Sequence, residues 1–410
     1  MGRDDERDDF DFSNDATQLS SRDLDGLADY LEEHERGVSR RLVDEIPPGL
    51  RIPRIVPDLR RVRPSPIEGA PTTLTAFLGI ATGDLTPVRV DGWKQYTQRW
   101  PDDTPLASAV EAYFRGGGQS AWIAPLAKLT PENASDAAAA LHRDVSLVAV
   151  VDDPAPAPEI VAAVSAALSG RRVMLLVEGP WTDAATARSA MSGDPATTVG
   201  AAGPDVAVYW PRVRVPSPTG VRSIAPLGPV AGAIVAGDLL AGVFSAPTGS
   251  RGALPGALGP VVTATPPEIA QLNPLGLNVI RELPDRGAMV WGARTLTTDP
   301  EWRYISVRRG AHFITASIER GLTWTASQPN AEPLWADVRR EVDGFLTNLW
   351  RSGALFGQKP SEAFFVRCDR TTMTETDIAE GRLICMVGFA PLRPAEFIVL
   401  RLTARTAVQP

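Results

Sequence analysis

Three short, almost uninterrupted apolar runs constrain the fold of this chain more than any other feature. They are Val145–Val151, Val173–Val177 and Val206–Tyr209, and alanine-rich stretches near 157–168 and 183–192 separate them. A strand that is apolar on both faces must be covered on both faces, and parallel strands need a long crossover between them. The alternation therefore predicts a mostly parallel β-sheet whose crossovers are helices.

The same pattern continues on both sides of these runs. A helix from about residue 105 is expected to stop at Gly116–Gly118, where the chain can reverse into a strand. A glycine- and alanine-rich helix is expected over about 229–243. Further strands are expected at Leu74–Gly79, Ala121–Ala124, Leu277–Arg281 and Ala288–Trp291. These elements predict an α/β body, doubly wound around a parallel sheet, over residues 66–302.

Residues 303–410 show a different pattern, which predicts a separate α+β domain. One helix is expected over about 307–321, and a second begins at Pro333 and ends before Gly353. The apolar side chains of the second helix share one face, whereas Arg339 and Arg340 lie off it. Three strands are expected to close the chain: Ala363–Cys368, Arg382–Phe389 and Glu396–Leu402.

Negative charge is concentrated at the start of the chain. Residues 1–45 hold 15 acidic and 6 basic side chains, a net charge of −9, whereas the whole chain carries −8, so the remaining residues sum to +1. We interpret residues 1–45 as an acidic extension that is partly disordered. A nearly neutral body lacks the basic surface that nucleic-acid binding requires, so no nucleic-acid partner is expected.

Residues 46–65 are expected to form an extended N-terminal arm. Pro53 and Pro57 exclude a central position in a sheet. An extended segment outside a compact body is suited to adding a strand to the sheet of a neighbour. The side chains expected to make these inter-subunit contacts are Ile52, Val56, Leu59 and Val62.

Motifs for catalysis are scarce. The three histidines, His34, His142 and His312, fall in no zinc-binding pattern, and the sequence contains no Gly-x-Ser-x-Gly. None of the three lysines follows a glycine, which excludes a P-loop. We therefore expect no catalytic residue and no cofactor.

Two possible ligand sites have plainer interpretations. The Gly116–Gly118 run could cradle a phosphate, although a helix stop is favoured. Asp152 and Asp153 could hold Mg²⁺, although acidic residues before a proline more often form a turn. No metal is expected, and Cys368 and Cys385 are too few for a disulfide scaffold or a four-thiolate metal site. Two reduced, buried thiols are favoured over a single bridge.

No export signal or membrane span is expected. The N-terminus is acidic where a signal peptide is basic and then apolar. The longest apolar stretch, Val230–Phe244, contains Asp238 and falls short of the ~20 apolar residues that a span needs. We therefore expect a soluble protein that stays in the cytoplasm until assembly or lysis.

A series of segments in the second half of the chain resembles one known family. The segments read LGLNVIR at 275–281, RGAMVWGART at 286–295, DPEWRYISVRR at 299–309, FLTNLW at 345–350, GALFG at 353–357, AFFVRCD at 363–369 and PAEF at 394–397. In this order they resemble the contractile tail sheath proteins of phages, bacteriocins and phage-tail-like injection systems. Weaker similarity, such as PIEG at 66–69, extends the resemblance to about 48–405, and residues 1–45 have no counterpart.

The resemblance implies a fold, a role and partners. Sheath subunits share a subtilisin-like α/β body without the catalytic residues of subtilisin. They stack as six-fold rings into a helical tube around an inner tube, and contraction drives that tube through a target envelope. The implied partners are other sheath subunits, the inner tube protein, and baseplate and terminator or cap proteins. The implied location is a phage tail or a phage-tail-like particle.

The resemblance also implies contacts between subunits. In the family, the N-terminal arm and the C-terminal strand reach into neighbours and complete a shared sheet. In this chain the exchanging strand would contain Glu396, Phe397, Val399 and Leu400.

Five arginines are further candidates for contacts. Arg294, Arg308 and Arg309 either pair within one subunit or span two subunits, and Arg339 and Arg340 are candidates to face the inner tube. Two other functions stay open as alternatives. One is a non-contracting sheath-like accessory or cap subunit, and the other is a subtilisin-like hydrolase, which the lack of a histidine motif disfavours.

Overall fold

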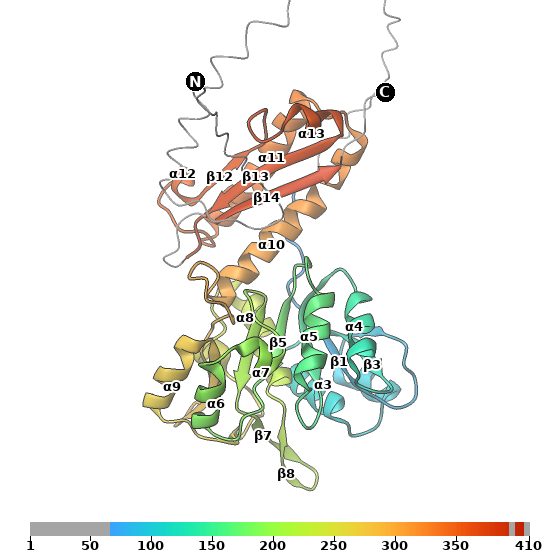
Figure 1. Cartoon of the computed structure of the whole chain (residues 1–410), viewed down its shortest axis with the longest axis vertical. Helices are drawn as coiled ribbons and strands as arrows, with labels where there is room; N and C mark the ends of the chain where they lie inside the picture. Colours follow the sequence, from blue (N-terminus) through green and yellow to red (C-terminus); the bar gives the residue numbers. More distant parts are fainter. Residues whose placement is uncertain (1–65, 393–397, 406–410) are drawn as a thin grey trace, which may run out of the picture.

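A computed structural model describes residues 66–392 and 398–405. The described chain forms two parts, and helix α10 (Ile305–Gly321) runs from the larger part into the smaller one (Figure 1). The expected acidic extension and the arm, with Ile52, Val56, Leu59 and Val62, lie outside the described residues, as do Glu396 and Phe397.

The larger part is built on an eight-stranded sheet with the order β11-β10-β6-β5-β4-β1-β3-β2. The six strands from β10 to β3 are parallel, and only β2 and β11, at the two edges, run antiparallel to their neighbours. The predicted parallel-rich α/β body is thus confirmed. The strands are β1 (Leu74–Ile80), β2 (Val88–Val90), β3 (Ser120–Leu126), β4 (Val145–Val151), β5 (Met174–Glu178), β6 (Val206–Trp210), β10 (Leu277–Leu283) and β11 (Gly287–Trp291).

Helices cover both faces of this sheet because the chain changes direction after β3. It steps from β1 to β3, crosses back over β1 to β4, and then continues through β5 and β6. Right-handed crossovers in opposite directions place their helices on opposite faces. The helices of the larger part are α2 (Trp93–Arg99), α3 (Pro105–Arg115), α4 (Pro131–Ala139), α5 (Pro158–Ala167), α6 (Ala184–Met191), α7 (Pro195–Val199), α8 (Leu227–Ala241) and α9 (Pro266–Leu272).

Strand β4 shows why the apolar runs are continuous. Leu147, Ala149 and Val151 belong to the core on the α3 and α8 side, whereas Val148 and Val150 belong to the core on the α4 and α5 side. Successive side chains of a strand point to opposite faces, so a strand with two covered faces needs apolar residues at every position.

A short local signal starts several of these helices. Thr104, Thr130 and Thr265 each precede a proline, and their side chains accept a backbone hydrogen bond from the third residue of the helix. The first N–H groups of a helix have no carbonyl partner within the helix. Proline has no N–H to leave unpaired there, and the threonine oxygen accepts a hydrogen bond from another of these N–H groups.

Helix α8 is the predicted glycine- and alanine-rich helix, and it lies against α3. A Cβ atom added at Gly228 would be 2.1 Å from the carbonyl oxygen of Ala109, and one at Gly232 would be 2.5 Å from that of Tyr113. The glycines therefore allow the two backbones to touch. This contact, together with burial of Leu227–Val235, explains why the stretch is apolar on all sides. Within the described residues no helix has the length and apolar character needed to cross a bilayer.

A small antiparallel sheet with the order β8-β7-β9 was not predicted. Its strands are β7 (Val213–Ser217), β8 (Gly220–Ile224) and β9 (Gly259–Pro260), and the β7–β8 hairpin projects from the end of the molecule opposite to the smaller part (Figure 1). Prolines at 216 and 218 weaken the strand signal, and β9 contains only two residues. Two short 3-10 turns, Gly249–Gly252 and Asn273–Leu275, complete this part.

The smaller part confirms the predicted C-terminal α+β pattern. Helix α11 (Glu332–Arg351) packs its apolar face, including Val338, Val342 and Leu346, on an antiparallel sheet with the order β12-β13-β14. The strands are β12 (Phe364–Arg367), β13 (Arg382–Phe389) and β14 (Ile398–Arg405), and the other elements are a 3-10 turn (Thr323–Ser327), α12 (Pro360–Ala363) and α13 (Glu375–Ala379).

Strand β14, which contains Val399 and Leu400, is the predicted exchanging strand. In this structure it pairs with β13 of its own chain, from Arg382 opposite Arg405 to Phe389 opposite Ile398. Exchange of β14 with a neighbouring subunit remains a prediction.

The α3–α8 contact leads to a stability prediction. Gly228→Ala should lower the free energy of unfolding by about 1–3 kcal/mol, because its Cβ would collide with backbone that cannot move freely. Gly237→Ala in the same helix is the matched control, since nothing lies within 4 Å of its added Cβ. Replacing that glycine should stabilise the helix by up to about 1 kcal/mol. Urea denaturation of both variants would measure the two effects, and equal changes would contradict the proposed contact.

Candidate functional site: the junction between helix α10 and the sheet

Helix α10 lies at the amino-terminal edge of the parallel sheet. The residues that precede the parallel strands start at one common edge, so Thr72 before β1, Asp144 before β4, Arg172 before β5 and Asp205 before β6 are brought together there. All four contact α10. This charged seam connects the two parts of the molecule.

Ion pairs along α10 follow the order of the strands. Arg308 donates to both carboxylate oxygens of Asp205, at 2.6 and 2.8 Å. Further along the helix, Glu319 accepts from Arg172 at 2.9 Å, and Arg320 pairs with Asp144. Charged side chains near the two ends of the helix therefore pair with residues that precede β6, β5 and β4. Because these pairs are half-exposed, each one adds little stability alone, and together they define the orientation of the helix.

The most buried pair joins Arg309 to Asp238. Both side chains are only 4% exposed. Arg309 donates to the two Asp238 oxygens at 2.8 and 2.6 Å and to the backbone oxygen of Thr72 at 3.1 Å. Asp238 lies near the end of α8, so this one arginine links α10, α8 and the segment before β1. The acidic residue that interrupts the longest apolar stretch therefore has a structural partner.

His312 shares Asp205 with Arg308. Its Nε2 atom lies 2.8 Å from an oxygen of Asp205, and the imidazole is almost fully buried. Burial opposes ionisation of Asp205, but the close contact with His312 and the hydrogen bonds from Arg308 outweigh it, so the pKa of Asp205 lies below its usual value. Burial lowers the pKa of His312, and the charges of Arg308 and Arg172 lower it further against the opposing effect of Asp205. Arg308 is therefore the cation that balances Asp205 at neutral pH.

Arg294, Arg308 and Arg309 were expected either to pair within one subunit or to span two subunits. In this structure all three make contacts inside the subunit. Arg308 and Arg309 form the ion pairs above, and Arg308 also lies over the Trp302 ring at 4.7 Å. Arg294 lies 6.0 Å from the centre of the Tyr304 ring. The backbone of Arg294 is held on both sides by the side chain of Asn278. The arginines thus help to build the junction.

The two arginines proposed to face the inner tube are in different environments. Arg339 donates to the backbone oxygen of Cys368 and so connects α11 to the end of β12. Arg340 has a side chain that is 61% exposed, with Asp337 and Glu341 beside it. Arg340 pairs with these two carboxylates at the exposed surface of its own helix, so it is the better placed of the two arginines to meet a partner.

A groove of about 650 Å³ lies beside α10 at the junction. Phe244 from the larger part, Phe313 from α10, and Leu349 and Phe389 from the smaller part contribute to its lining. The groove separates the two parts along this side. The ion pairs and packed residues of α10 join the larger part to the smaller part.

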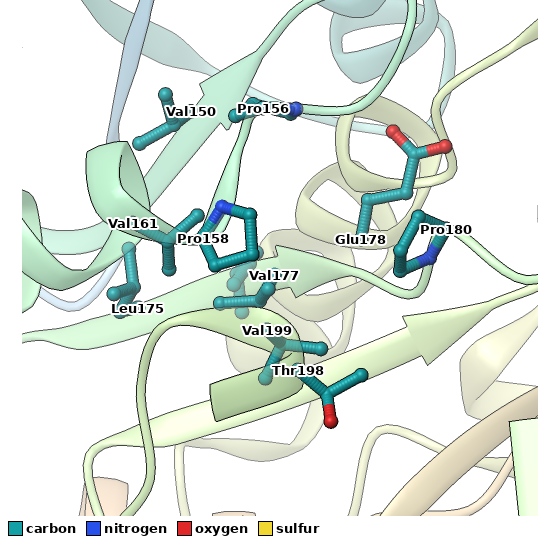
Figure 2. Close-up of a pocket in the computed structure, with 11 residues that line it drawn as sticks. Val150, Pro156, Pro158, Val161, Leu175, Val177, Glu178, Pro180, Thr198 and Val199 are labelled. Carbon is teal, nitrogen blue, oxygen red and sulfur yellow. The ribbon is translucent and has the colours of Figure 1, made fainter. Parts of the chain in front are cut away.

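The carboxyl-terminal edge of the sheet is where α/β folds bind their ligands. In this chain Arg212 bridges Glu178, the last residue of β5, at 2.5 Å, and Asp153, after β4, at 2.7 Å. Glu178 is 2% exposed, and burial raises its pKa, while Arg212 opposes this shift. The neighbouring cavity of about 20 Å³ has room for about one water molecule. Figure 2 shows that its wall consists mainly of proline and valine side chains, with the Glu178 carboxylate to one side.

The two histidines in the part of the chain that the structure describes do not reach this edge. His142 precedes β4 and His312 contacts Asp205, so both described histidines lie at the opposite, amino-terminal edge. A serine triad needs a histidine beside its nucleophile. Within residues 66–392 and 398–405 the arrangement therefore offers no histidine to a hydrolytic site at the usual position.

The two plainer interpretations of possible ligand sites fit the structure. Gly116–Gly118 ends α3, and Gly117 has φ +106°, a conformation that favours glycine. Asp153 accepts from Arg212, and the Asp152 side chain accepts the backbone N–H of Asp153. These residues form a helix stop and a turn.

The buried pair of Arg309 and Asp238 leads to a prediction about the free energy of unfolding. Asp238→Asn leaves Arg309 buried without its carboxylate, and we expect a loss of about 3–5 kcal/mol in the free energy of unfolding. Arg309→Met combined with Asp238→Leu removes both charges and should recover most of that loss. Asp91→Asn is a control, because its pair with Arg89 is exposed and should contribute less than about 1 kcal/mol. Denaturation curves that show similar losses for Asp238→Asn and Asp91→Asn would contradict this assignment.

Comparison with known proteins identifies the fold. The profile of the phage tail sheath protein central domain matches residues 127–296, and that of the phage tail sheath C-terminal domain matches residues 297–405. A prophage major tail sheath protein of Pseudomonas aeruginosa (strain UCBPP-PA14) is 24% identical over 119 residues, a match that spans 29% of each protein.

Two solved structures are similar over nearly the whole chain. One is the helical sheath of the anti-feeding prophage (AFP) in its contracted state, with 31% identity and a TM-score of 0.70 over 87% of this chain and 99% of that one. The other is the PVC sheath complex of an extracellular contractile injection system in its contracted state, with 27% identity and a TM-score of 0.71 over 88% and 98%. On this evidence the chain belongs to the contractile phage tail sheath protein family.

Proposed function

We propose that this protein is the sheath subunit of a contractile tail, which polymerises into a helical tube around an inner tube and contracts to drive it through a target envelope. The observation that carries the proposal is the similarity, at 31% identity over 99% of the other chain, to a helical sheath in its contracted state. A subunit that assembles through heterologous contacts forms an open helical tube, because such contacts do not close.

Backbone pairing is the proposed link between subunits. In the described residues the outer edges of β12 and β14 have no strand beside them. An edge strand presents free N–H and C=O groups, which favours addition of a strand from another chain. We propose that β14, with Val399 and Leu400, exchanges with a neighbour, and that the arm with Ile52, Val56, Leu59 and Val62 adds to such a sheet.

Rigid subunits suit this role. The ion pairs of α10 hold the smaller part at one orientation to the sheet of the larger part. When subunits move relative to one another, exchanged strands keep them connected while each subunit keeps its internal contacts. Contraction would then draw on changes in packing and electrostatics between subunits, with no need for nucleotide hydrolysis. The proposed role is structural, without catalysis.

The proposed partners follow from this role. They are other copies of this chain in stacked six-fold rings, the inner tube protein, and baseplate and terminator or cap proteins. We propose that Arg340, on the exposed face of α11, contacts acidic groups of the inner tube, whereas Arg339 supports the sheet behind it. Assembly in the cytoplasm and release by lysis complete the proposal.

The arm gives the first test. A chain without residues 46–62 should fold but not polymerise, because it lacks the strand that we propose to join subunits. Size-exclusion chromatography and circular dichroism would show a folded monomer, and negative-stain microscopy would show no striated tubes. A chain without residues 1–45, which keeps the arm, is the control and should form tubes. Normal tubes from the chain without 46–62 would reject strand addition by the arm.

The exposed arginine gives the second test. Arg340→Glu should reduce co-assembly with the inner tube protein, measured as the fraction of tube retained with sheath in co-sedimentation. The fold should be kept, since this side chain is exposed. Arg143→Glu, at an 85% exposed position on the larger part, is the matched control and should leave co-assembly unchanged. Equal co-assembly of both variants and the wild type would exclude Arg340 from the tube contact.

A further inference from the structure

The two cysteines of the chain lie opposite each other in the C-terminal sheet. Cys368 directly follows β12, and Cys385 lies within β13. The antiparallel register pairs Arg367 with Met386, so the next pair along these strands is Cys368 with Cys385. Both residues are fully buried, and the Cys368 thiol is close enough to Cys385 to be the main influence on its pKa.

This placement meets the geometric requirement for a disulfide. Directly opposed residues of an antiparallel pair have Cα atoms about 4.5–5.5 Å apart. Disulfides join Cα atoms about 4.4–6.8 Å apart. Neither strand would have to leave the sheet to form the bond.

We propose that Cys368 and Cys385 form a reversible intrachain disulfide that locks β12 to β13 when the protein meets an oxidising thiol–disulfide pool. Both thiols are free in the present structure. The pair then acts as a redox-sensitive lock within one subunit.

The chemistry balances with a small disulfide such as glutathione disulfide as the oxidant. The thiolate of one cysteine attacks the oxidant, forms a mixed disulfide and releases one glutathione. The second cysteine attacks the protein sulfur of the mixed disulfide and releases the second glutathione. Two electrons pass from the two cysteines to the oxidant, and the two thiol protons end on the two glutathione molecules.

The surroundings predict slow oxidation. Hydrogen bonding to Cys368 and burial raise the pKa of the Cys385 thiol well above its ordinary value, so little reactive thiolate exists in the closed fold. Cys368 stands at the end of β12, next to the turn at Asp369–Thr372. Local opening of this strand end is the expected route for the oxidant.

The lock would stabilise the region that carries β14. It closes the loop between Cys368 and Cys385, which contains α13, and Arg339 of α11 is anchored on the Cys368 backbone oxygen. A cross-link that restricts the unfolded chain favours the folded state. The disulfide would join β12 to β13 and would leave the backbone hydrogen bonds between β13 and β14 unchanged. The proposed exchange of β14 therefore does not require the disulfide.

The test uses the full chain, reduced and then incubated with glutathione disulfide. After quenching and alkylation under denaturing conditions, mass spectrometry should show monomers without alkylated thiols and a peptide that links Cys368 to Cys385. The Tm of the oxidised protein should lie above that of the reduced protein, and dithiothreitol should reverse the shift. Thiols that stay alkylatable, or bonds only between chains, would overturn the proposal.

Cys368→Ala and Cys385→Ala are matched controls. Each keeps one thiol, so each should form glutathione adducts at most and show no upward shift in Tm. If a variant folds poorly, peptide mapping and the Tm of the wild type decide the question alone. Tube assembly can be scored on the same samples, and a chain that forms the bond but no tubes would contradict the proposed sheath function without affecting the lock.

Discussion

The buried ion pair between Arg309 and Asp238 is the interaction on which the rest of this structure depends. It connects α10, α8 and the segment before β1, at a depth where each charge would be unstable without the other. Around it, weaker pairs such as Arg308–Asp205 align α10 with the edge of the sheet. The position of the whole C-terminal sheet relative to the larger part therefore depends on one short stretch of charged residues.

In the role that we propose, a sheath subunit would keep its shape while its neighbours move, and the contacts at the two edges of the parallel sheet are consistent with that role. The amino-terminal edge holds α10, and the carboxyl-terminal edge, which in α/β enzymes binds ligands, is closed by Arg212 between Glu178 and Asp153. A parallel sheet of this topology can present a catalytic site. In this chain the sheet holds the helix that joins the two parts of the molecule.

Much of the architecture could be predicted from the sequence. The strands at Val145–Val151 and Arg382–Phe389 were predicted with the observed limits, because continuous apolar runs and alternation are local signals. The β7–β8 hairpin was missed because its prolines contradict strand propensity, and its pairing depends on tertiary contacts. Of the candidate site, the sequence indicated Arg308 and Arg309 as important but could not assign their partners.

The sequence by itself determined the alternating α/β pattern, the family, and the concentration of negative charge in residues 1–45. Only the tertiary structure decided that Arg309 pairs with Asp238 and that Cys368 lies opposite Cys385. The physical reason is that periodicity and composition act over neighbouring residues, whereas these pairs join residues far apart in the chain. Such pairs form because crossover direction and strand register bring them to the same edge or the same strand pair.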